Sequence, residues 1–321
     1  MSKKRTIDSF FASETTAKKK LKTEDVIDEN TPCSTHNTYP FPIPELPPSL
    51  SQELSSWPAV PGRAINDQPD LDLLYFEPFI PAYAAKPLFH FLRSQLPFYR
   101  VEYKINRGGT ETQIRTPRFT TVFGLDATST FSATGTILDA KTNKPVPPGT
   151  YTRYPPRPIP KCLDDLRHST EAATGHAFNF CLVNYYASGA DSISFHSDDE
   201  RFLGPEPVIA SFSLGARRDF YMKHKPFPPA SGGPETKQVK LPLGSGDMVL
   251  MRGGTQANWL HSIPKRTGRN ERDGGRINIT FRRAMVKGGT DNYYNYNVGN
   301  GPVYRWDGEA GEMRVWKKPS V

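Results

Sequence analysis

Cysteine and long apolar runs are both scarce in this sequence. The three cysteines, Cys33, Cys162 and Cys181, show no CxxC or disulfide-like spacing, which favours a reducing compartment over a disulfide framework. No apolar stretch is long enough to span a membrane, and the first residues are charged where a signal peptide needs an apolar core. We therefore expect a soluble intracellular protein without a membrane partner.

Acidic residues are outnumbered by basic ones. Lys and Arg total 41 and Asp and Glu total 33, which gives a formal net charge of +8 and a pI of about 9.3. This balance favours an anionic partner, and nucleic acid before membrane, because no amphipathic basic helix is present. A chain of 321 residues can form one large domain with a substantial core, or two small ones. We expect it to act as a monomer.

Residues 1–65 differ in texture from the rest of the chain. The basic clusters SKKR and KKKLK are followed by the proline-dense run YPFPIPELPP. Such a segment buries too little apolar surface to offset its ordering entropy, so we expect residues 1–65 to be a disordered tail. Within it, KKRTIDSFF sets Ile7 three residues before Phe10 and Phe11, a spacing that gathers apolar side chains on one face of a helical turn.

Regular apolar periodicity marks residues 66–288. Helices are expected over AYAAKPLFHFLRSQL and over CLDDLRHSTEAATG, which ends at Gly175. Short strands separated by Gly, Pro or Asp are expected at YFEPFI, AFNFCLVNYY, SISFHSDD, VIASFSLGA, RDFYMKHK, KQVKLPL, GDMVLMR and RINITFRRA. Many short strands after a few helices indicate a mainly β domain, built as an antiparallel barrel or sandwich. Residues 289–321 form a C-terminal extension rich in Gly, Asn and Tyr, expected to be either a loosely packed tail or a set of stacking aromatics for nucleic acid.

His196 and Asp198 lie two residues apart in SISFHSDD. On a strand that runs into a loop, side chains two apart project to the same face and can converge on one ion. Imidazole and carboxylate make up two-thirds of the facial triad that binds non-haem Fe(II). The best third ligand is His261 in NWLHSIPKR, just past a strand. A solvated acidic loop is the alternative interpretation.

The segment RINITFRR has an unusual alternation. On a strand, one face is apolar and the other carries Arg276, Asn278, Thr280 and Arg282. Arginines that point into a barrel must find anions, and a small dicarboxylate suits the two-pronged guanidinium. In FNFCLVNYY, Asn184 and Tyr186 place two polar tips beside the same cavity, on a face shared with Phe178, Phe180 and Leu182. The alternative is that the arginines pair with Asp or Glu on a neighbouring strand.

Through these motifs the sequence resembles the AlkB family of Fe(II)/2-oxoglutarate dioxygenases, and within it the eukaryotic nuclear branch that repairs alkylated DNA. The resemblance runs from about Tyr75 to Arg283 and is densest in TGHAFNFCLVNYYASGADSISFHSDDERFLG, WLHSIPKR and RINITFRR. It implies a double-stranded β-helix, or jelly roll, with flanking N-terminal helices. It also implies Fe(II) as cofactor, with 2-oxoglutarate and O2 as co-substrates. The implied reaction is oxidative demethylation of 1-methyladenine or 3-methylcytosine in DNA, with release of succinate, CO2 and formaldehyde.

The resemblance further implies a role for individual residues. The iron ligands of the catalytic centre correspond to His196, Asp198 and His261. The 2-oxoglutarate pocket corresponds to Asn184, Tyr186, Arg276, Thr280 and Arg282. The substrate-binding residues correspond to Asp199, Glu200, Arg118, Tyr151 and Arg153, with the exocyclic amine of the lesion base assigned to Asp199. The hairpin NRGGTETQIRTPR occupies the place of an apolar finger that fills the gap left by a flipped base, yet it carries no Phe wedge, which leaves the preference between duplex and single strand open.

Two motifs in the N-terminal segment resemble short motifs that would suit a nuclear repair enzyme. KKRTIDSFF resembles the peptide that binds the sliding clamp PCNA, with Lys4 in place of the usual glutamine, Ile7 as the aliphatic plug, and Phe10 and Phe11 as the aromatic pair. KKKLK resembles a nuclear localisation signal. We therefore expect nuclear localisation. The alternative for KKRTIDSFF is a chance occurrence, and the alternative for KKKLK is a solvated charge run.

Two other classes of function stay open. A dioxygenase of the same fold could demethylate RNA or hydroxylate a protein, and a catalytically silent jelly roll could serve as a binding module. Asp199, Glu200, the basic charge and the clamp-like motif favour DNA, although RNA is harder to exclude than protein. The complete His-Asp-His set and the inward arginines argue against a silent module.

Overall fold

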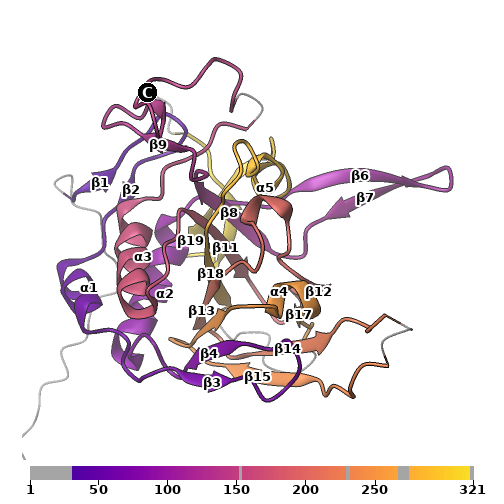
Figure 1. Cartoon of the computed structure of the whole chain (residues 1–321). Coiled ribbons are helices and arrows are strands. Elements are labelled where there is room, and N and C mark those ends of the chain that lie inside the picture. Colours follow the sequence, from indigo (N-terminus) through magenta and orange to yellow (C-terminus); the bar gives the residue numbers. More distant parts are fainter. Residues whose placement is uncertain (1–30, 152–153, 229–231, 267–274, 319–321) are drawn as a thin grey trace, which may run out of the picture. The chain divides into compact units, whose positions relative to one another are not determined.

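The computed structural model describes residues 31–151, 154–228, 232–266 and 275–318 (Figure 1). Pro32–Val321 form one compact unit. The clamp-like motif with Lys4, Ile7, Phe10 and Phe11, both basic clusters, and Arg153 lie outside the described residues.

The helices comprise five α-helices and two short 3-10 helices within the described residues: α1 (Pro48–Ser51), η1 (Gln52–Ser56), α2 (Ala82–Gln95), α3 (Lys161–Thr174), η2 (Arg201–Leu203), α4 (Thr255–Asn258) and α5 (Asp291–Asn297). The strands up to α3 are β1 (Cys33–Ser34), β2 (Ile43–Pro44), β3 (Arg63–Ile65), β4 (Leu73–Phe76), β5 (Phe98–Tyr99), β6 (Glu102–Arg107), β7 (Thr110–Arg115), β8 (Phe119–Gly124), β9 (Ser129–Phe131) and β10 (Ile137–Asp139). The strands after α3 are β11 (Phe180–Tyr186), β12 (Ile193–His196), β13 (Ile209–Gly215), β14 (Arg218–His224), β15 (Val239–Leu243), β16 (Met248–Met251), β17 (Trp259–Ile263), β18 (Arg276–Arg282), β19 (Val303–Asp307) and β20 (Glu312–Val315).

The consecutive strands β11 to β18 form a jelly roll. Four of them, in the order β11-β18-β13-β16, are the centre of a ten-stranded sheet, and the other four form a second sheet in the order β12-β17-β14-β15. The chain therefore crosses repeatedly between two antiparallel sheets, with one hairpin, β14–β15, inside the smaller sheet. The mainly β, double-stranded β-helix fold expected from the sequence is confirmed.

Two helices, α2 and α3, lie on one side of the large sheet (Figure 1) and bury apolar residues in the same core cluster as that sheet. In α2 the buried residues recur every three or four positions, which gives one apolar stripe ending at Leu92. This stripe packs against β13 and β19, and it belongs to the same core cluster as Ile277, Ile279 and Phe281 of β18. Helix α3 ends at Gly175, whose φ of +72° is the left-handed conformation that closes many helices. Both helices were expected from the sequence.

A second apolar core lies between the two sheets. It joins Leu73 and Tyr75 of β4 to Phe220 and Met222 of β14 and to Trp259 of β17. Burial of such side chains stabilises the sandwich by about 25 cal/mol for each Å² of apolar surface removed from water. The polar residues of β18 lie outside this apolar cluster, so the inner face of the large sheet has an apolar part and a polar part.

The expected disorder of residues 1–65 is wrong for residues 32–65. Six apolar side chains of this stretch are buried in the helix-side core, namely Tyr39, Ile43, Leu46, Leu50, Leu54 and Trp57. The Tyr39 hydroxyl donates to the Pro158 carbonyl, and the Ser169 hydroxyl of α3 donates to the Leu54 carbonyl. The prolines impose extended backbone, but the apolar residues between them still find a surface to cover.

The C-terminal extension is not a loosely packed tail. Strand β19 continues the large sheet beside β5, and β20 forms its edge. Helix α5 buries Tyr293 and Tyr294 with Phe180 and Phe202 in a third apolar cluster. Among the described helices, none has the length and apolar character that crossing a bilayer would require.

Candidate active site

A cavity of about 670 Å³ opens at the polar end of the jelly roll. Side chains from β11, β12, β17 and β18 form its floor, and the hairpin β6–β7, η2 and α5 contribute to its walls. The polar face of β18 lines it through Arg276, Asn278, Thr280 and Arg282, while the intervening apolar residues face the helices. The alternation expected from RINITFRR is confirmed.

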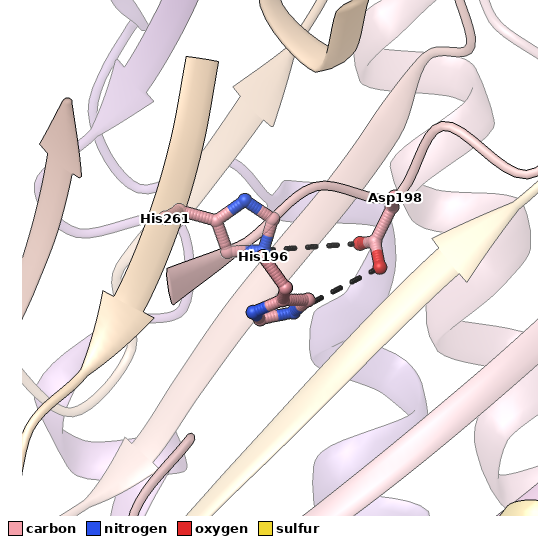
Figure 2. A group of neighbouring side chains, drawn as sticks. All are labelled: His196, Asp198 and His261. Atoms are coloured by element: carbon pink, nitrogen blue, oxygen red, sulfur yellow. Dashed lines mark ion pairs between the residues drawn. The ribbon is translucent and has the colours of Figure 1, made fainter. Parts of the chain in front are cut away.

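His196, Asp198 and His261 point toward one another inside this cavity (Figure 2). Their ligand atoms all lie within 4.8 Å of one another. Nε2 of His196 is 4.0 Å from Oδ1 of Asp198, and Nε2 of His261 is 3.9 Å from Oδ2. The pairing of β12 with β17 sets His196 opposite His261, so one sheet positions both imidazoles. Asp198 lies beyond the end of β12, where its backbone N–H donates to the Gln256 Oε1 atom.

The protonation states of this group suit a cation. Burial opposes ionisation of Asp198, yet the adjacent Arg282 guanidinium and the two imidazoles hold its carboxyl pKa well below the usual range. Burial, reinforced by the neighbouring His196, lowers the pKa of His261 to about 3, so its imidazole is neutral at pH 7. Nδ1 of His196 contacts the Ser194 carbonyl 2.9 Å away, so Nε2 is the ring nitrogen that faces Asp198. Imidazole nitrogens and an ionised carboxylate are the donors of a facial triad.

Arg276 lines the same cavity, where its guanidinium lies over the Tyr186 ring, 5.3 Å from the ring centroid. Only about 1% of the residue is exposed, and its Nη2 donates to the Ser213 hydroxyl at 2.6 Å. Nε and Nη1 have no hydrogen-bond partner in the part of the chain that the structure describes. Burial lowers the pKa of this guanidinium to about 10, so it remains charged at pH 7. A buried cation with two free N–H groups requires an anion.

Polar side chains around Arg276 hold their positions through specific bonds. The Arg282 guanidinium donates to Asp198 Oδ2 at 2.7 Å and to the Thr280 hydroxyl at 2.6 Å. Arg118 donates from Nε to Asn184 Oδ1 at 2.8 Å. Tyr186 and Arg118 also line the cavity, as do Asn184 and Thr280. The structure therefore brings together all five residues assigned to the 2-oxoglutarate pocket.

The residues present fit both groups that the resemblance implies. The His-Asp-His donor set matches the preference of Fe(II) for imidazole and carboxylate with open positions. The orphaned N–H groups of Arg276 match the terminal carboxylate of a dicarboxylic acid. His196, Asp198 and His261 would hold the metal, and Arg276 would hold the far end of 2-oxoglutarate.

Glu200 and Asp199 occupy different environments although they are neighbours in sequence. Asp199 lies toward the surface, where Nζ of Lys225 donates to its Oδ2 at 2.8 Å. Glu200 lines the cavity, and its buried Oε2 has no partner among the described residues. Burial and the nearby Asp198 carboxylate raise the Glu200 pKa. The carboxylate that faces the interior is thus Glu200.

The remaining substrate candidates are dispersed. Tyr151 is not among the residues that line the cavity. Its hydroxyl donates to Asp126 Oδ2 at 2.6 Å. The hairpin β6–β7 extends well away from the jelly roll in Figure 1 and turns at Gly108 and Gly109, both of which have positive φ. At its base the cross-strand pair Tyr103 and Ile114 lines the cavity, so the hairpin presents apolar side chains there without a Phe.

Two positions at the site were missed in the sequence. Gln256 of α4 accepts from the Asp198 backbone, and Tyr293 of α5 donates its hydroxyl to Glu200 Oε1 at 2.9 Å. The run DNYYNYN contained a usable signal, since Tyr293 and Tyr296 are three residues apart on a helical face.

Comparison with known proteins defines the family. Residues 72–282 match the 2OG-Fe(II) oxygenase superfamily. The chain is 46% identical over 140 residues to the alpha-ketoglutarate-dependent dioxygenase alkB homolog 3 of Rattus norvegicus, covering 42% of this chain and 46% of that protein. It is 39% identical over 131 residues to the DNA oxidative demethylase ALKBH2 of Homo sapiens, covering 41% and 49%.

One relative matches a longer part of the chain. The DNA oxidative demethylase ALKBH2 of Arabidopsis thaliana is 32% identical over 232 residues, which cover 67% of each protein. The chain spans about half the length of the alkB homolog 3 proteins that it matches. The proteins of this superfamily require Fe(II), 2-oxoglutarate and O2, and the cavity holds donors for the first two. The chain belongs to the AlkB family of the 2OG-Fe(II) oxygenase superfamily.

Proposed function

We propose that this protein demethylates N-alkylated bases in DNA, with 1-methyladenine and 3-methylcytosine as substrates and with release of succinate, CO2 and formaldehyde. The observation that carries the proposal is one cavity that joins three features of the described residues: a His-Asp-His group, a buried arginine with two N–H groups that lack a partner, and a buried carboxylate with one oxygen that lacks a partner. Each of these three features matches one participant: the metal, the 2-oxo acid and the base. The relatives named as DNA oxidative demethylases support the choice of DNA.

The chain contributes binding and orientation. When bound, Fe(II) supplies the oxidative chemistry, in which one methyl group and 2-oxoglutarate are oxidised by one O2. Arg276 would bind the distal carboxylate of 2-oxoglutarate through the two N–H groups that lack a partner. Arg282 neutralises Asp198 at 2.7 Å, which fixes that carboxylate between the imidazoles. None of these roles demands a proton transfer from a side chain.

Glu200 supports the choice of a methylated base. Its free Oε2 could accept a hydrogen bond from the exocyclic amine that adenine and cytosine share. Methylation at the ring nitrogen makes both bases cationic, which suits an anionic side chain in a buried site. Methylation also blocks base pairing, so extrusion of the damaged base costs less than extrusion of a normal one.

The rim of the cavity supports a nucleic acid substrate. Tyr103 of the hairpin and Tyr296 of α5 meet edge to face, with ring centroids 6.2 Å apart, and both side chains are substantially exposed. Exposed aromatic rings at a cavity mouth can stack on bases, which contributes about 1–3 kcal/mol per base. Arg118 and Arg201 add positive charge to the same lining.

We also propose nuclear localisation and recruitment by PCNA. Their support is confined to KKKLK and KKRTIDSFF in the sequence, which lie outside the described residues. A basic net charge and a DNA substrate agree with both proposals.

The decisive assay measures formaldehyde and succinate from the full chain with Fe(II), ascorbate and 2-oxoglutarate. The substrates are one sequence carrying 3-methylcytosine or 1-methyladenine as single-stranded DNA, duplex DNA and RNA, each beside its unmethylated control. We expect equal amounts of formaldehyde and succinate, and only with methylated DNA or at a higher rate with DNA than with RNA. Faster turnover of the RNA would move the substrate to RNA. Succinate without formaldehyde from any of these strands would contradict base demethylation.

A further inference from the structure

Helix α5 lies beyond the part of the chain that matches the oxygenase superfamily, yet it forms a wall of the cavity. The match ends at residue 282, whereas α5 spans Asp291–Asn297. Its side chains Asn292, Tyr293, Tyr296 and Asn297 line the cavity. The C-terminal extension therefore reaches the site that the core of the family encloses.

Tyr293 makes the most direct contact between this helix and the site. Its hydroxyl donates to Oε1 of Glu200 at 2.9 Å and lies 3.4 Å from Oδ1 of Asp198. It is the side-chain donor that the described structure provides for Glu200, because Arg282 is engaged by Asp198 and Thr280. Without this hydroxyl, Glu200 would face Asp198 with no side-chain hydrogen bond from the described residues to fix its orientation.

The ring of Tyr293 is held in place by its surroundings. It meets Phe180 and Phe202 edge to face, with centroids 5.5 Å and 5.4 Å away. The Arg282 guanidinium lies over the same ring, 5.4 Å from its centroid. A phenol packed on three sides delivers its hydroxyl to a fixed point, as a supporting residue of a preorganised site must.

The next residue, Tyr294, turns the other way and anchors the helix. Its hydroxyl donates to the Gly124 carbonyl and accepts from the Arg157 backbone N–H, both at 2.9 Å. At the end of α5 the Thr120 hydroxyl of β8 donates to the Asn297 carbonyl at 2.6 Å. Tyr293 and Tyr294 thus bury equivalent hydroxyls on one short helix, and only Tyr293 contacts the carboxylates.

We propose that Tyr293 is a positioning residue that holds the Glu200 carboxylate toward the substrate side of the cavity, so that α5 sets the affinity for a methylated base. This inference rests on the proposed function, since Glu200 is taken to receive the base. It assigns the C-terminal extension a part in substrate selection, in addition to the edge strands that it adds to the sheet.

The test compares Tyr293→Phe with Tyr294→Phe, which removes the neighbouring buried hydroxyl and serves as the matched control. Each full-length variant is loaded with Mn(II) and N-oxalylglycine so that no turnover occurs. The dissociation constant is then measured for a single-stranded oligonucleotide with one 3-methylcytosine and for its unmethylated counterpart. The same measurements in a Glu200→Gln background complete a double-mutant cycle.

Tyr293→Phe should weaken binding of the methylated strand about tenfold, the equivalent of one hydrogen bond to a charged group. It should leave binding of the unmethylated strand unchanged. Tyr294→Phe loosens the anchor of α5 without removing a bond to Glu200, so it should preserve the discrimination between the two strands. In the Glu200→Gln background the effect of Tyr293→Phe should fall below twofold.

Four outcomes would overturn the proposal. The positioning role would be overturned, with the proposed function left standing, if Tyr293→Phe still discriminated fully between the two strands. The same holds if Tyr293→Phe and Tyr294→Phe lost equal affinity for the methylated strand. An undiminished tenfold effect in the Glu200→Gln background would show that Tyr293 does not act through Glu200. Equal binding of both strands by the wild type would overturn the proposed function together with this inference.

Discussion

Replacement of Arg276 by leucine should have opposite effects on stability and on co-substrate binding. In the free protein Arg276 is about 1% exposed, and among the described residues its guanidinium forms a hydrogen bond through Nη2 alone, to Ser213. Because two N–H groups are desolvated without a partner, leucine should stabilise the free protein by about 1–2 kcal/mol. For a chain of this size, that change raises Tm by about 2–6 °C.

The same substitution removes the proposed fork for 2-oxoglutarate. A two-pronged, charge-assisted contact contributes about 3 kcal/mol, and each 1.4 kcal/mol is a factor of ten in affinity. We therefore expect the KM for 2-oxoglutarate to rise about a hundredfold in Arg276→Leu. Arg276→Lys keeps the charge without the two-pronged contact, so its KM for 2-oxoglutarate should lie between those of the wild type and Arg276→Leu.

Thermal denaturation with Mn(II), with and without 2-oxoglutarate, measures both effects in one experiment. The wild type should gain stability as 2-oxoglutarate is added, since a ligand that binds only the folded state raises Tm. Arg276→Leu should start from a higher Tm and gain almost nothing. A lower starting Tm together with an unchanged response to 2-oxoglutarate would refute the assignment of Arg276 to the co-substrate.

The other predictions concern the metal group, the cavity rim and the N-terminal motif. Asp198→Ala and His196→Ala should both abolish turnover. Only Asp198→Ala should also lower the free energy of unfolding, by about 3–5 kcal/mol, because it leaves the buried Arg282 guanidinium without its partner. Equal Tm values for the two variants would contradict this expectation. Tyr296→Ala should weaken binding of single-stranded DNA about tenfold through lost stacking, with an unchanged KM for 2-oxoglutarate as its control. A peptide of residues 1–15 should bind PCNA and lose binding on Phe10→Ala, and no binding at high micromolar peptide would remove that proposal.

Much of the fold was predictable because the jelly-roll strands carry local signals. Alternation in RINITFRR indicated both faces of β18, and Gly175 marked the end of α3. The alternation in β11 was extended too far, however. Phe178 lies before the strand begins at Phe180 and packs on the helix side with Phe281. A period of two holds only where the backbone is continuously extended.

The parts of the site that were missed depend on contacts distant in sequence. His261 was expected just past a strand, but it lies within β17, whose register with β12 sets it opposite His196. Asp199 and Glu200 look alike in sequence, and only the distant Lys225 and Tyr293 give them different environments. No local pattern contains such pairings, because they arise from tertiary packing.

The burial of residues 32–65 has a practical consequence for work with shorter forms of the protein. A truncated chain that begins at residue 66 would strip Ile43, Leu50 and Trp57, among others, from the outer surfaces of α2 and α3. The exposed patch would be apolar and contiguous, a surface of the kind that promotes aggregation. Low solubility of such a fragment would reflect a damaged core, so a start no later than Pro32 is the one that preserves it.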